Sequence, residues 1–179
     1  MWEPLTASAP RLRRLLTWDE ALLVWVSRLH MPHLTPLMLG LTRSGDTESW
    51  FLYGIFLFVI GFQLEAVLLV AGGLGATLPV QILKRVLRRR RPTRRILGFS
   101  ALEPDPDAFS FPSGHTATAF GVALSFLLAE SAFAGPAFGL ASGIALSRVY
   151  LGAHYPIDVG VGAVLGTFGA FVSWMILGG

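Results

Sequence analysis

Five long apolar segments run through this sequence and restrict the folds open to it. They occupy residues 47–63, 66–84, 116–133, 136–150 and 156–177, and each contains few charged side chains. A helix needs about 20 apolar residues to cross a bilayer, and backbone polar groups in lipid must be hydrogen-bonded within the spanning structure. We therefore expect an all-α protein, a polytopic transmembrane helical bundle of about five spans.

The composition supports a membrane protein. Charged residues make up 14% of the chain, against about 25% in an average soluble domain. The length of 179 residues favours a single domain, residues 1–179. The sequence contains no cysteine, so it can form no disulfide, thiol nucleophile or cysteine-ligated metal site.

The N-terminal region predicts a helix of another kind. Apolar residues recur there at helical spacing, and polar residues gather on the opposite side. The apolar set is Trp18, Leu22, Trp25, Val26 and Leu29, and the polar set is Asp19, Glu20, Ser27 and His30. Tryptophan favours the headgroup level of a bilayer, so we expect an interfacial amphipathic helix. A helix packed against a partner element inside the protein is the alternative.

Basic residues are concentrated after the second apolar segment. Eight of the fourteen Lys and Arg residues lie between Lys84 and Arg95. The cluster lies between two predicted spans without interleaved aromatic residues, which argues against a nucleic-acid partner. The lipid bilayer, through anionic headgroups, and phosphate are the partners we expect. Headgroup anchoring would explain six of these residues: Arg85, Arg88, Arg89, Arg90, Arg94 and Arg95.

The segment 85–112 is long, polar and rich in proline, and a loop of that length is usually functional or disordered. Its acidic run, Glu103, Asp105 and Asp107, lacks the ligand spacing of a calcium loop. We expect these carboxylates to be solvated.

Three fragments hold the residues that suggest chemistry. They are Lys84-x6-Arg91-Pro92, Pro112-Ser113-Gly114-His115 and Ser147-Arg148-x5-His154-x3-Asp158. Each fragment lies at the end of a predicted span. The alternation of the spans places all three on one face of the membrane.

The second fragment predicts an anion site at the start of a span. Ser113 is a natural N-cap, and Gly114 allows a ligand to approach the backbone closely. Unpaired N–H groups and the helix dipole attract anions at such a position. A simple helix cap would explain Ser113 and Gly114, but it would not explain His115.

The third fragment predicts an oriented histidine. Pro156 suits a first helical position, which places Asp158 in the first turn, from where it can reach back to His154. A carboxylate so placed fixes the tautomer of the ring and leaves its other nitrogen free to attack phosphorus. Arg148 adds a planar fork that fits phosphate oxygens. An ordinary His–Asp cap is the alternative interpretation.

The three fragments together resemble the tripartite signature of the type 2 phosphatidic acid phosphatase (PAP2) superfamily. Residues 41–45 also resemble the segment that precedes the second span in small bacterial members. The resemblance implies a nucleophilic His154 oriented by Asp158, and an acid, His115, that protonates the leaving oxygen. It implies that phosphate is bound by Lys84, Arg91, Ser113, Gly114 and Arg148, and that no metal or other cofactor is needed. Many members have six spans, and we expect this chain to have an amphipathic N-terminal helix in place of the first.

The resemblance implies a membrane lipid phosphatase that forms a phosphohistidine. The sequence does not choose among phosphatidic acid, phosphatidylglycerophosphate and polyprenyl mono- or diphosphates, and it gives no oligomeric state. A non-catalytic lipid-phosphate carrier or scramblase stays open as an alternative, as does a vanadate-dependent haloperoxidase.

The expected location is the bacterial cytoplasmic (inner) membrane. Short basic loops tend to stay cytoplasmic, and the basic segments 11–14 and 84–95 both lie on the predicted catalytic side. This favours a cytoplasm-facing site, although many bacterial relatives in the family work on the outer face.

Overall fold

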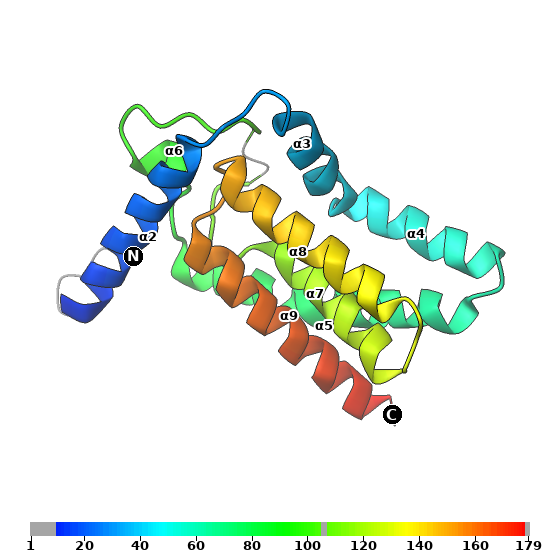
Figure 1. The fold of residues 1–179 in the computed structure, drawn as a ribbon. Helices are drawn as coiled ribbons and strands as arrows, with labels where there is room; N and C mark the ends of the chain where they lie inside the picture. Colours follow the sequence, from blue (N-terminus) through cyan, green and yellow to red (C-terminus); the bar gives the residue numbers. More distant parts are fainter. Residues whose placement is uncertain (1–9, 105–106, 178–179) are drawn as a thin grey trace.

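The structure is a computed structural model that describes residues 10–104 and 107–177. Within these ranges it is all-α, which confirms the predicted fold class (Figure 1). The eight described helices are α2 (Pro10–Ser27), α3 (Thr35–Ser44), α4 (Thr47–Val59), α5 (Gln63–Leu87), α6 (Pro92–Arg95), α7 (Gly114–Leu128), α8 (Ala134–Tyr150) and α9 (Pro156–Ile176).

Helices α5, α7 and α9 pack against one another, α8 lies on α7, and α4 lies on α5. Small residues allow the backbones to approach closely at the crossings. A Cβ added at Gly121 of α7 would lie 2.7 Å from the carbonyl oxygen of Gly72 in α5. Gly169 of α9 packs in the same way against the backbone of Gly75. Such contacts are typical of helices that associate in lipid.

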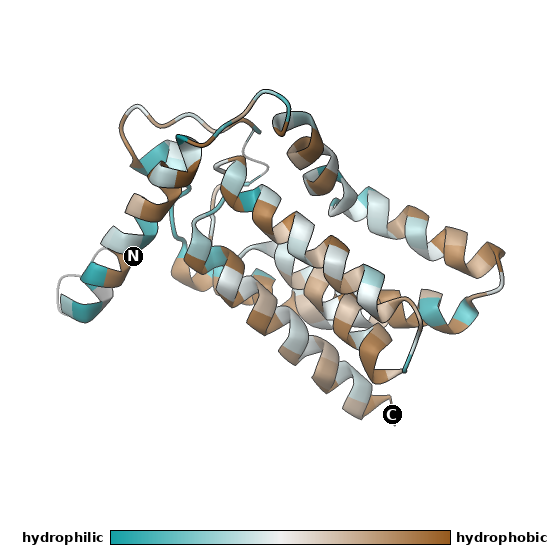
Figure 2. Ribbon diagram, viewed as in Figure 1, coloured by the Kyte–Doolittle hydropathy of each residue, from teal (hydrophilic) through white to brown (hydrophobic). Residues whose placement is uncertain are grey.

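Two helices, α5 and α9, are long and apolar enough to cross a membrane. Only 33% and 17% of their apolar windows are buried within the protein, whereas a core helix of a soluble protein would be mostly buried. The helices α4 and α7 are shorter and apolar. Large apolar side chains such as Phe51, Val59 and Ile176 are exposed. Hydrophobic residues, in brown, recur along the helices of the bundle (Figure 2).

The five predicted spans correspond to α4, α5, α7, α8 and α9, with shifted boundaries. The helix α3 was not predicted, because Pro32 and Pro36 suggested a broken chain. Pro36 lies in the first turn of α3, where a proline costs no helical hydrogen bond.

The N-terminal helix α2 exposes Trp18, Leu22 and Trp25, as the predicted apolar stripe requires. Asp19 lies opposite the apolar stripe, as predicted, but that side of α2 is packed against the protein there, as in the alternative interpretation. Asp19 is 3% exposed and lies on the buried face of α2 between Leu16 and Leu23. The carboxylate tolerates burial because it pairs with Arg89.

Candidate active site

The chain turns sharply after α5, and two of the arginines that follow point into the protein. Lys84 lies in the last turn of α5, and Arg88 then adopts a left-handed conformation with φ of 50°. Arg89 and Arg91 follow that turn, and both have an exposure of 0%. Arg85, Arg88, Arg90, Arg94 and Arg95 are exposed. The interpretation of Arg89 as a headgroup anchor is therefore wrong, because its side chain is enclosed by two carboxylates.

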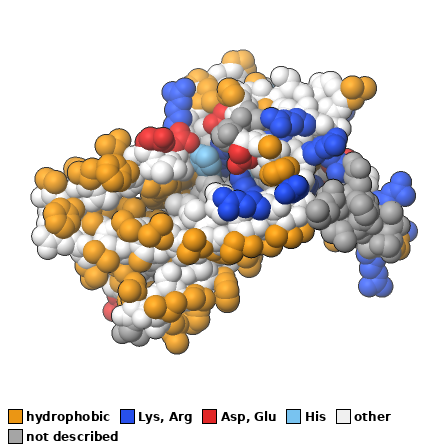
Figure 3. All heavy atoms as spheres, turned by 180° about the vertical axis from the view of Figure 1, so that it is seen from behind, with side chains coloured by type: hydrophobic (Ala, Val, Ile, Leu, Met, Phe, Trp, Pro, Cys, Tyr) orange, Lys and Arg blue, Asp and Glu red, His pale blue; other side chains and the backbone are white. Residues whose placement is uncertain are grey.

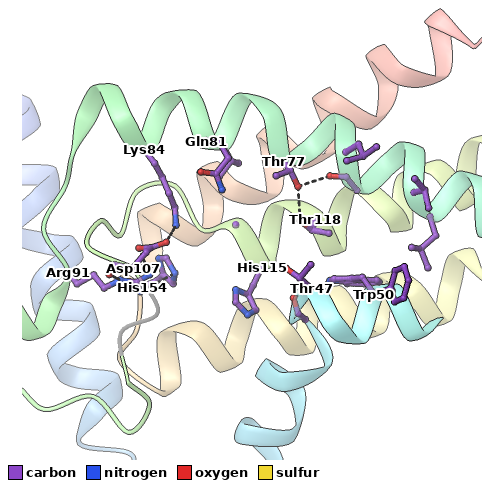
Figure 4. Close-up of a pocket in the computed structure, with 18 residues that line it drawn as sticks. Thr47, Trp50, Thr77, Gln81, Lys84, Arg91, Asp107, His115, Thr118 and His154 are labelled. Atoms are coloured by element: carbon purple, nitrogen blue, oxygen red, sulfur yellow. Dashed lines mark hydrogen bonds and ion pairs between the residues drawn. The ribbon is translucent and has the colours of Figure 1, made fainter. Parts of the chain in front are cut away.

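The three fragments contribute to one cavity of about 510 Å³. Its polar end is lined by Lys84, Arg91, Asp107, Gly114, His115 and His154 (Figure 4). In the space-filling view, Lys, Arg, Asp, Glu and His side chains gather at one end of the molecule, while the rest of that face is largely apolar (Figure 3). The structure thus brings the fragments together at one end of the bundle, as the alternation of spans predicts.

The start of α7 is held against α9. Ser113 occupies the N-cap position, and its backbone N–H donates to the Asp158 carbonyl oxygen at 3.0 Å. A Cβ at Gly162 would lie 2.6 Å from the Ser113 carbonyl oxygen, so glycine is needed for this contact. The Ser113 hydroxyl does not cap the helix but lies 3.0 Å from that of Thr116. A Cβ at Gly114 would meet only Val80, at 4.0 Å, which leaves the backbone there open.

The contacts of His154 favour one tautomer of its imidazole. Its Nε2 lies 3.4 Å from Nη1 of Arg91, and because a guanidinium can only donate, this contact favours an unprotonated Nε2. Its Nδ1 lies 3.7 Å from Oδ2 of Asp158, beyond hydrogen-bond length, and has no hydrogen-bond partner among the described residues. Burial, then the charges of Arg148, Arg91 and Lys84, lower the pKa of His154 well below its usual value. The ring is therefore neutral at neutral pH.

Asp158 is fixed from two sides. Its Oδ2 accepts a hydrogen bond from the Tyr155 backbone N–H at 3.1 Å, and its Oδ1 accepts one from Arg89 at 2.5 Å. The first contact is part of a capping box that begins α9. Asp158 therefore caps the helix and also faces His154, so the two interpretations of this pair are compatible.

Asp46 faces the second histidine. Its Oδ1 lies 2.8 Å from Nε2 of His115. Asp46 occupies the N-cap position of α4 without a side-chain capping bond. The two residues lie 69 positions apart in the sequence, so no local pattern predicts this pair.

The expectation of solvated loop carboxylates is wrong for two of the three. Asp107 accepts from Lys84 at 2.5 Å and from Arg91 at 2.8 Å, and Glu103 accepts from Arg148 at 2.5 Å. Burial alone would raise the pKa of Asp107, but the hydrogen bond from Lys84 and the charges of Arg91 and Lys84 lower it to about 2. Asp105 lies outside the described residues. We call Glu103 and Asp107 the loop carboxylates.

Arg148 is completely buried and only partly hydrogen-bonded. Its Nη1 donates to Thr42 and Glu103, whereas Nε and Nη2 have no hydrogen-bond partner within the described ranges. Buried donors of a guanidinium are costly to leave unpaired, so they indicate a place for an anion. Thr42 lies in the segment 41–45 that the sequence singled out. No group of three His, Asp or Glu residues in the described parts could hold a metal ion.

The chain is similar in sequence to proteins of a known family. The sequence matches the PAP2 superfamily over residues 47–178. It is 37% identical over 103 residues to the decaprenylphosphoryl-5-phosphoribose phosphatase of Mycobacterium tuberculosis, across 57% of this chain and 56% of that protein. It is 30% identical over 151 residues to the undecaprenyl-diphosphatase of Sulfolobus acidocaldarius, across 80% of this chain and 70% of that protein.

A solved structure is similar as well. The transmembrane PAP2 type phosphatidylglycerolphosphate phosphatase of Bacillus subtilis superposes with a TM-score of 0.74 at 25% identity, over 91% of this chain and 86% of that one. The match to the mycobacterial phosphatase spans only about half of that protein's length.

Proposed function

This chain belongs to the PAP2 superfamily and is a membrane protein, and on that basis we propose that it is a lipid phosphate phosphatase acting through a phosphohistidine. One observation supports this most directly. A buried, neutral histidine presents an unprotonated nitrogen in a cavity that Lys84 and Arg91 line. A nucleophile beside fixed cations is the arrangement that phosphoryl transfer needs.

His154 is the proposed nucleophile, through Nε2. Its tautomer puts a lone pair on Nε2, which is held only by the long 3.4 Å contact with Arg91 and becomes available when Arg91 turns to the phosphate, and Asp158 faces the opposite nitrogen at 3.7 Å. Attack on phosphorus makes the ring cationic, and the nearby carboxylate then stabilises that charge. Asp158 is thus a proposed orienting residue.

The proposed phosphate site uses charge from three cations and a helix end. Lys84 and Arg91, which line the cavity, and Arg148, which is buried with Nε and Nη2 unpaired among the described residues, supply the charges. Ser113 with the Gly114 amide forms the start of α7. The macrodipole and unpaired N–H groups of that terminus favour an anion. These groups can neutralise the charge of the transferring phosphoryl group, so the proposal needs no metal or cofactor.

His115 is the proposed acid, held by Asp46. In the first step His115 starts as the imidazolium paired with Asp46; the bond from Nε2 of His154 to phosphorus forms, the bond from phosphorus to the lipid oxygen breaks, and His115 gives one proton to that oxygen and becomes neutral. In the second step His115 takes a proton from water, the water oxygen attacks phosphorus, and phosphate leaves as the bond to His154 breaks. Protons and bonds balance over the two steps.

The shape of the cavity favours a lipid substrate. An apolar groove of about 610 Å³ lies between α4 and α5 and shares Trp50, Phe51, Val70 and Leu74 with the cavity. A phosphate held at the polar end would place an attached apolar chain along this groove. The two relatives named above act, by name, on decaprenyl- and undecaprenyl-linked phosphates, so polyprenyl phosphates stand first among the candidate substrates.

The proposed spans are α4, α5, α7, α8 and α9, with α2 at the interface and the site facing the cytoplasm of a bacterial inner membrane. The exposed arginines near the site support this orientation. Leu97 is fully exposed on the catalytic side, and Ala132 is exposed in the turn at the opposite end. Because the chain lacks cysteine, Leu97→Cys and Ala132→Cys can be labelled singly with an impermeant maleimide in intact cells. We expect label at position 132 alone, and label at 97 alone would reverse the orientation.

Phosphate release from a panel of lipid phosphates in detergent with EDTA tests the function. The panel comprises phosphatidic acid, phosphatidylglycerophosphate, and polyprenyl mono- and diphosphates. We expect release from at least one lipid and none from His154→Ala. His33→Ala, which alters an exposed histidine outside the cavity, is the matched control and should retain activity. No release from any lipid, with vanadate still bound, would favour a carrier.

A further inference from the structure

A buried ion cluster links the N-terminal helix to the carboxylate that faces His154. Arg89 donates from Nη1 to Asp158 at 2.5 Å and from Nη2 to Asp19 at 2.7 Å. All three side chains have an exposure of 0%. We call Asp19, Arg89 and Asp158 the buried ion cluster. Asp19 lies outside the three sequence fragments, and Arg89 occupies one of the six unspecified positions between Lys84 and Arg91.

The cluster is held by contacts from several elements. The second oxygen of Asp19 accepts from the Ile157 backbone N–H at 2.9 Å, one residue before Asp158. The Tyr155 ring lies 3.9 Å from the guanidinium carbon of Arg89. Residues 155, 157 and 158, at the start of α9, are therefore each bound to Arg89 or Asp19. Because His154 directly precedes this segment, its ring depends on the same contacts.

Asp19 is needed to fix the orientation of Arg89 beside Asp158. Arg89 compensates the charge of Asp158, but a buried guanidinium with one ionic partner could rotate away from it. Asp19 binds the second arm of the fork and leaves Arg89 one orientation. Burial would by itself lower the pKa of Arg89, but the charges of Asp158 and Asp19 raise it. Arg89 therefore keeps its charge beside Asp158.

We propose that Asp19 and Arg89 are positioning residues, which hold Asp158 ionised and aimed at His154, and that α2 is thereby part of the catalytic assembly. This inference rests on the proposed phosphatase function. Neither residue touches the phosphate. Their role is to stabilise the cationic ring of His154 indirectly, as outer carboxylates do for histidines in other sites.

The substitution Asp19→Asn tests this with little change in shape. The amide oxygen can still accept from Ile157, but the amide NH₂ faces Arg89 with donors only. We expect kcat on the active lipid phosphate to fall about tenfold or more, in the range typical of outer-shell partners. KM and the orthovanadate concentration for half-inhibition should stay within about twofold, because the phosphate-binding cations are untouched.

Glu20→Gln is the matched control. Glu20 is the next residue on α2 and also pairs with an arginine, Arg95, at 2.6 Å, but it makes no contact with Asp158. Its kcat should equal that of the wild type. Arg89→Lys keeps the charge but not the fork, so its kcat should lie between those of the wild type and Asp19→Asn. It also serves as the test if Asp19→Asn does not fold.

Three results would overturn the proposal. The first is wild-type kcat in a folded Asp19→Asn, and the second is an equal loss of kcat and vanadate affinity, which would indicate general damage. The third is wild-type kcat in Arg89→Lys when Asp19→Asn does not fold. A wild-type protein that releases no phosphate overturns the phosphatase function and the positioning role together. An active wild type with unaffected variants overturns the positioning role alone.

Discussion

The buried ion cluster and the loop carboxylates compensate neighbouring arginines in different ways. In the buried ion cluster, Arg89 and both of its carboxylate partners are fully enclosed. The loop carboxylates Asp107 and Glu103, which bind the proposed phosphate-binding cations, have side chains that are 44% and 20% exposed. The first set is closed to ligands, and the second can be displaced.

The contrast between the two sets explains how the site can keep several cations compensated without phosphate and still bind phosphate. A buried pair that loses one member leaves an uncompensated charge, which costs several kcal/mol. In the loop pairs the cations are buried but the carboxylates are partly exposed, so a carboxylate can move into water while an incoming phosphate takes its place beside the cation. We therefore infer that the loop carboxylates substitute for phosphate in the unliganded protein, while the buried ion cluster stays intact throughout turnover.

Arg89→Met tests whether the buried ion cluster is needed for stability. It leaves two buried carboxylates without a cation, and we expect a loss of about 3–5 kcal/mol in the free energy of unfolding. Chemical denaturation in detergent would measure the loss. Arg85→Met, an exposed neighbour on α5, should leave stability unchanged. Equal stability of the two variants would show that the buried cluster is not a structural charge pair.

Lys84→Met tests the ion pairs of the loop carboxylates, which we expect phosphate to displace. Asp107 keeps Arg91 as a partner, so stability should change little. Loss of a cation at the transferring phosphoryl group should lower kcat/KM by about 10²–10³-fold. Phosphate release and thermal unfolding of one preparation would measure both quantities. A large loss of stability would mean that Lys84, like the buried ion cluster, forms an ion pair that the fold requires.

Asp107→Asn should have a smaller effect, on the affinity of the site for an anion. A neutral amide competes less with an anion for Lys84 and Arg91, so orthovanadate should inhibit at about two- to fivefold lower concentration, as the loss of one exposed ion pair implies. Glu48→Gln removes the same charge from an exposed position on α4 and should have no such effect. Weaker inhibition of Asp107→Asn would mean that the carboxylate orients the cations for phosphate.

The pH dependence of stability should separate His154 from Asp107. His154 has a folded pKa below its ordinary 6.5, so only the unfolded chain binds this proton between the two values. Stability should therefore fall as the pH drops below 6.5, by up to about 1.4 kcal/mol per pH unit, and His154→Asn should reduce this slope. The contribution of Asp107 is complete above its unfolded pKa of 3.8 and is lost only as the pH falls toward about 2.

An unchanged slope in His154→Asn between pH 5 and 6.5 would mean that His154 titrates normally in the folded protein. The comparison needs only unfolding midpoints of the two proteins in one detergent.

The fold was largely predictable, because the length and composition of each apolar segment predict a helix without reference to the rest of the chain. Five of the helices were expected near their observed bounds, and the three fragments indicated which ends meet. The helix α3 was missed because its proline lies at a position that sequence alone cannot distinguish from a break. Two spans are supported directly by length and composition, and the other three stay a proposal.

The partners of the cations could not be predicted in the same way. Arg89 is one of four consecutive arginines, and only the left-handed turn at Arg88 decides which of them points inward. Asp19 and Asp46 meet partners about 70 residues away, and Asp107 lies in a proline-spaced run that looks solvated. The local sequence pattern indicates the periodicity of a helix. These pairs depend instead on the tertiary structure, which brings residues far apart in the sequence into contact.

The central claim is that phosphate passes through His154, and direct trapping of the phosphorylated enzyme tests it. The protein would be mixed with a lipid phosphate labelled in its phosphoryl group, quenched in alkali within milliseconds to seconds, and digested for mass spectrometry. The account predicts an acid-labile phosphate on the peptide that contains His154, and its absence in His154→Ala. Label on another residue, or normal turnover by His154→Ala, would contradict it.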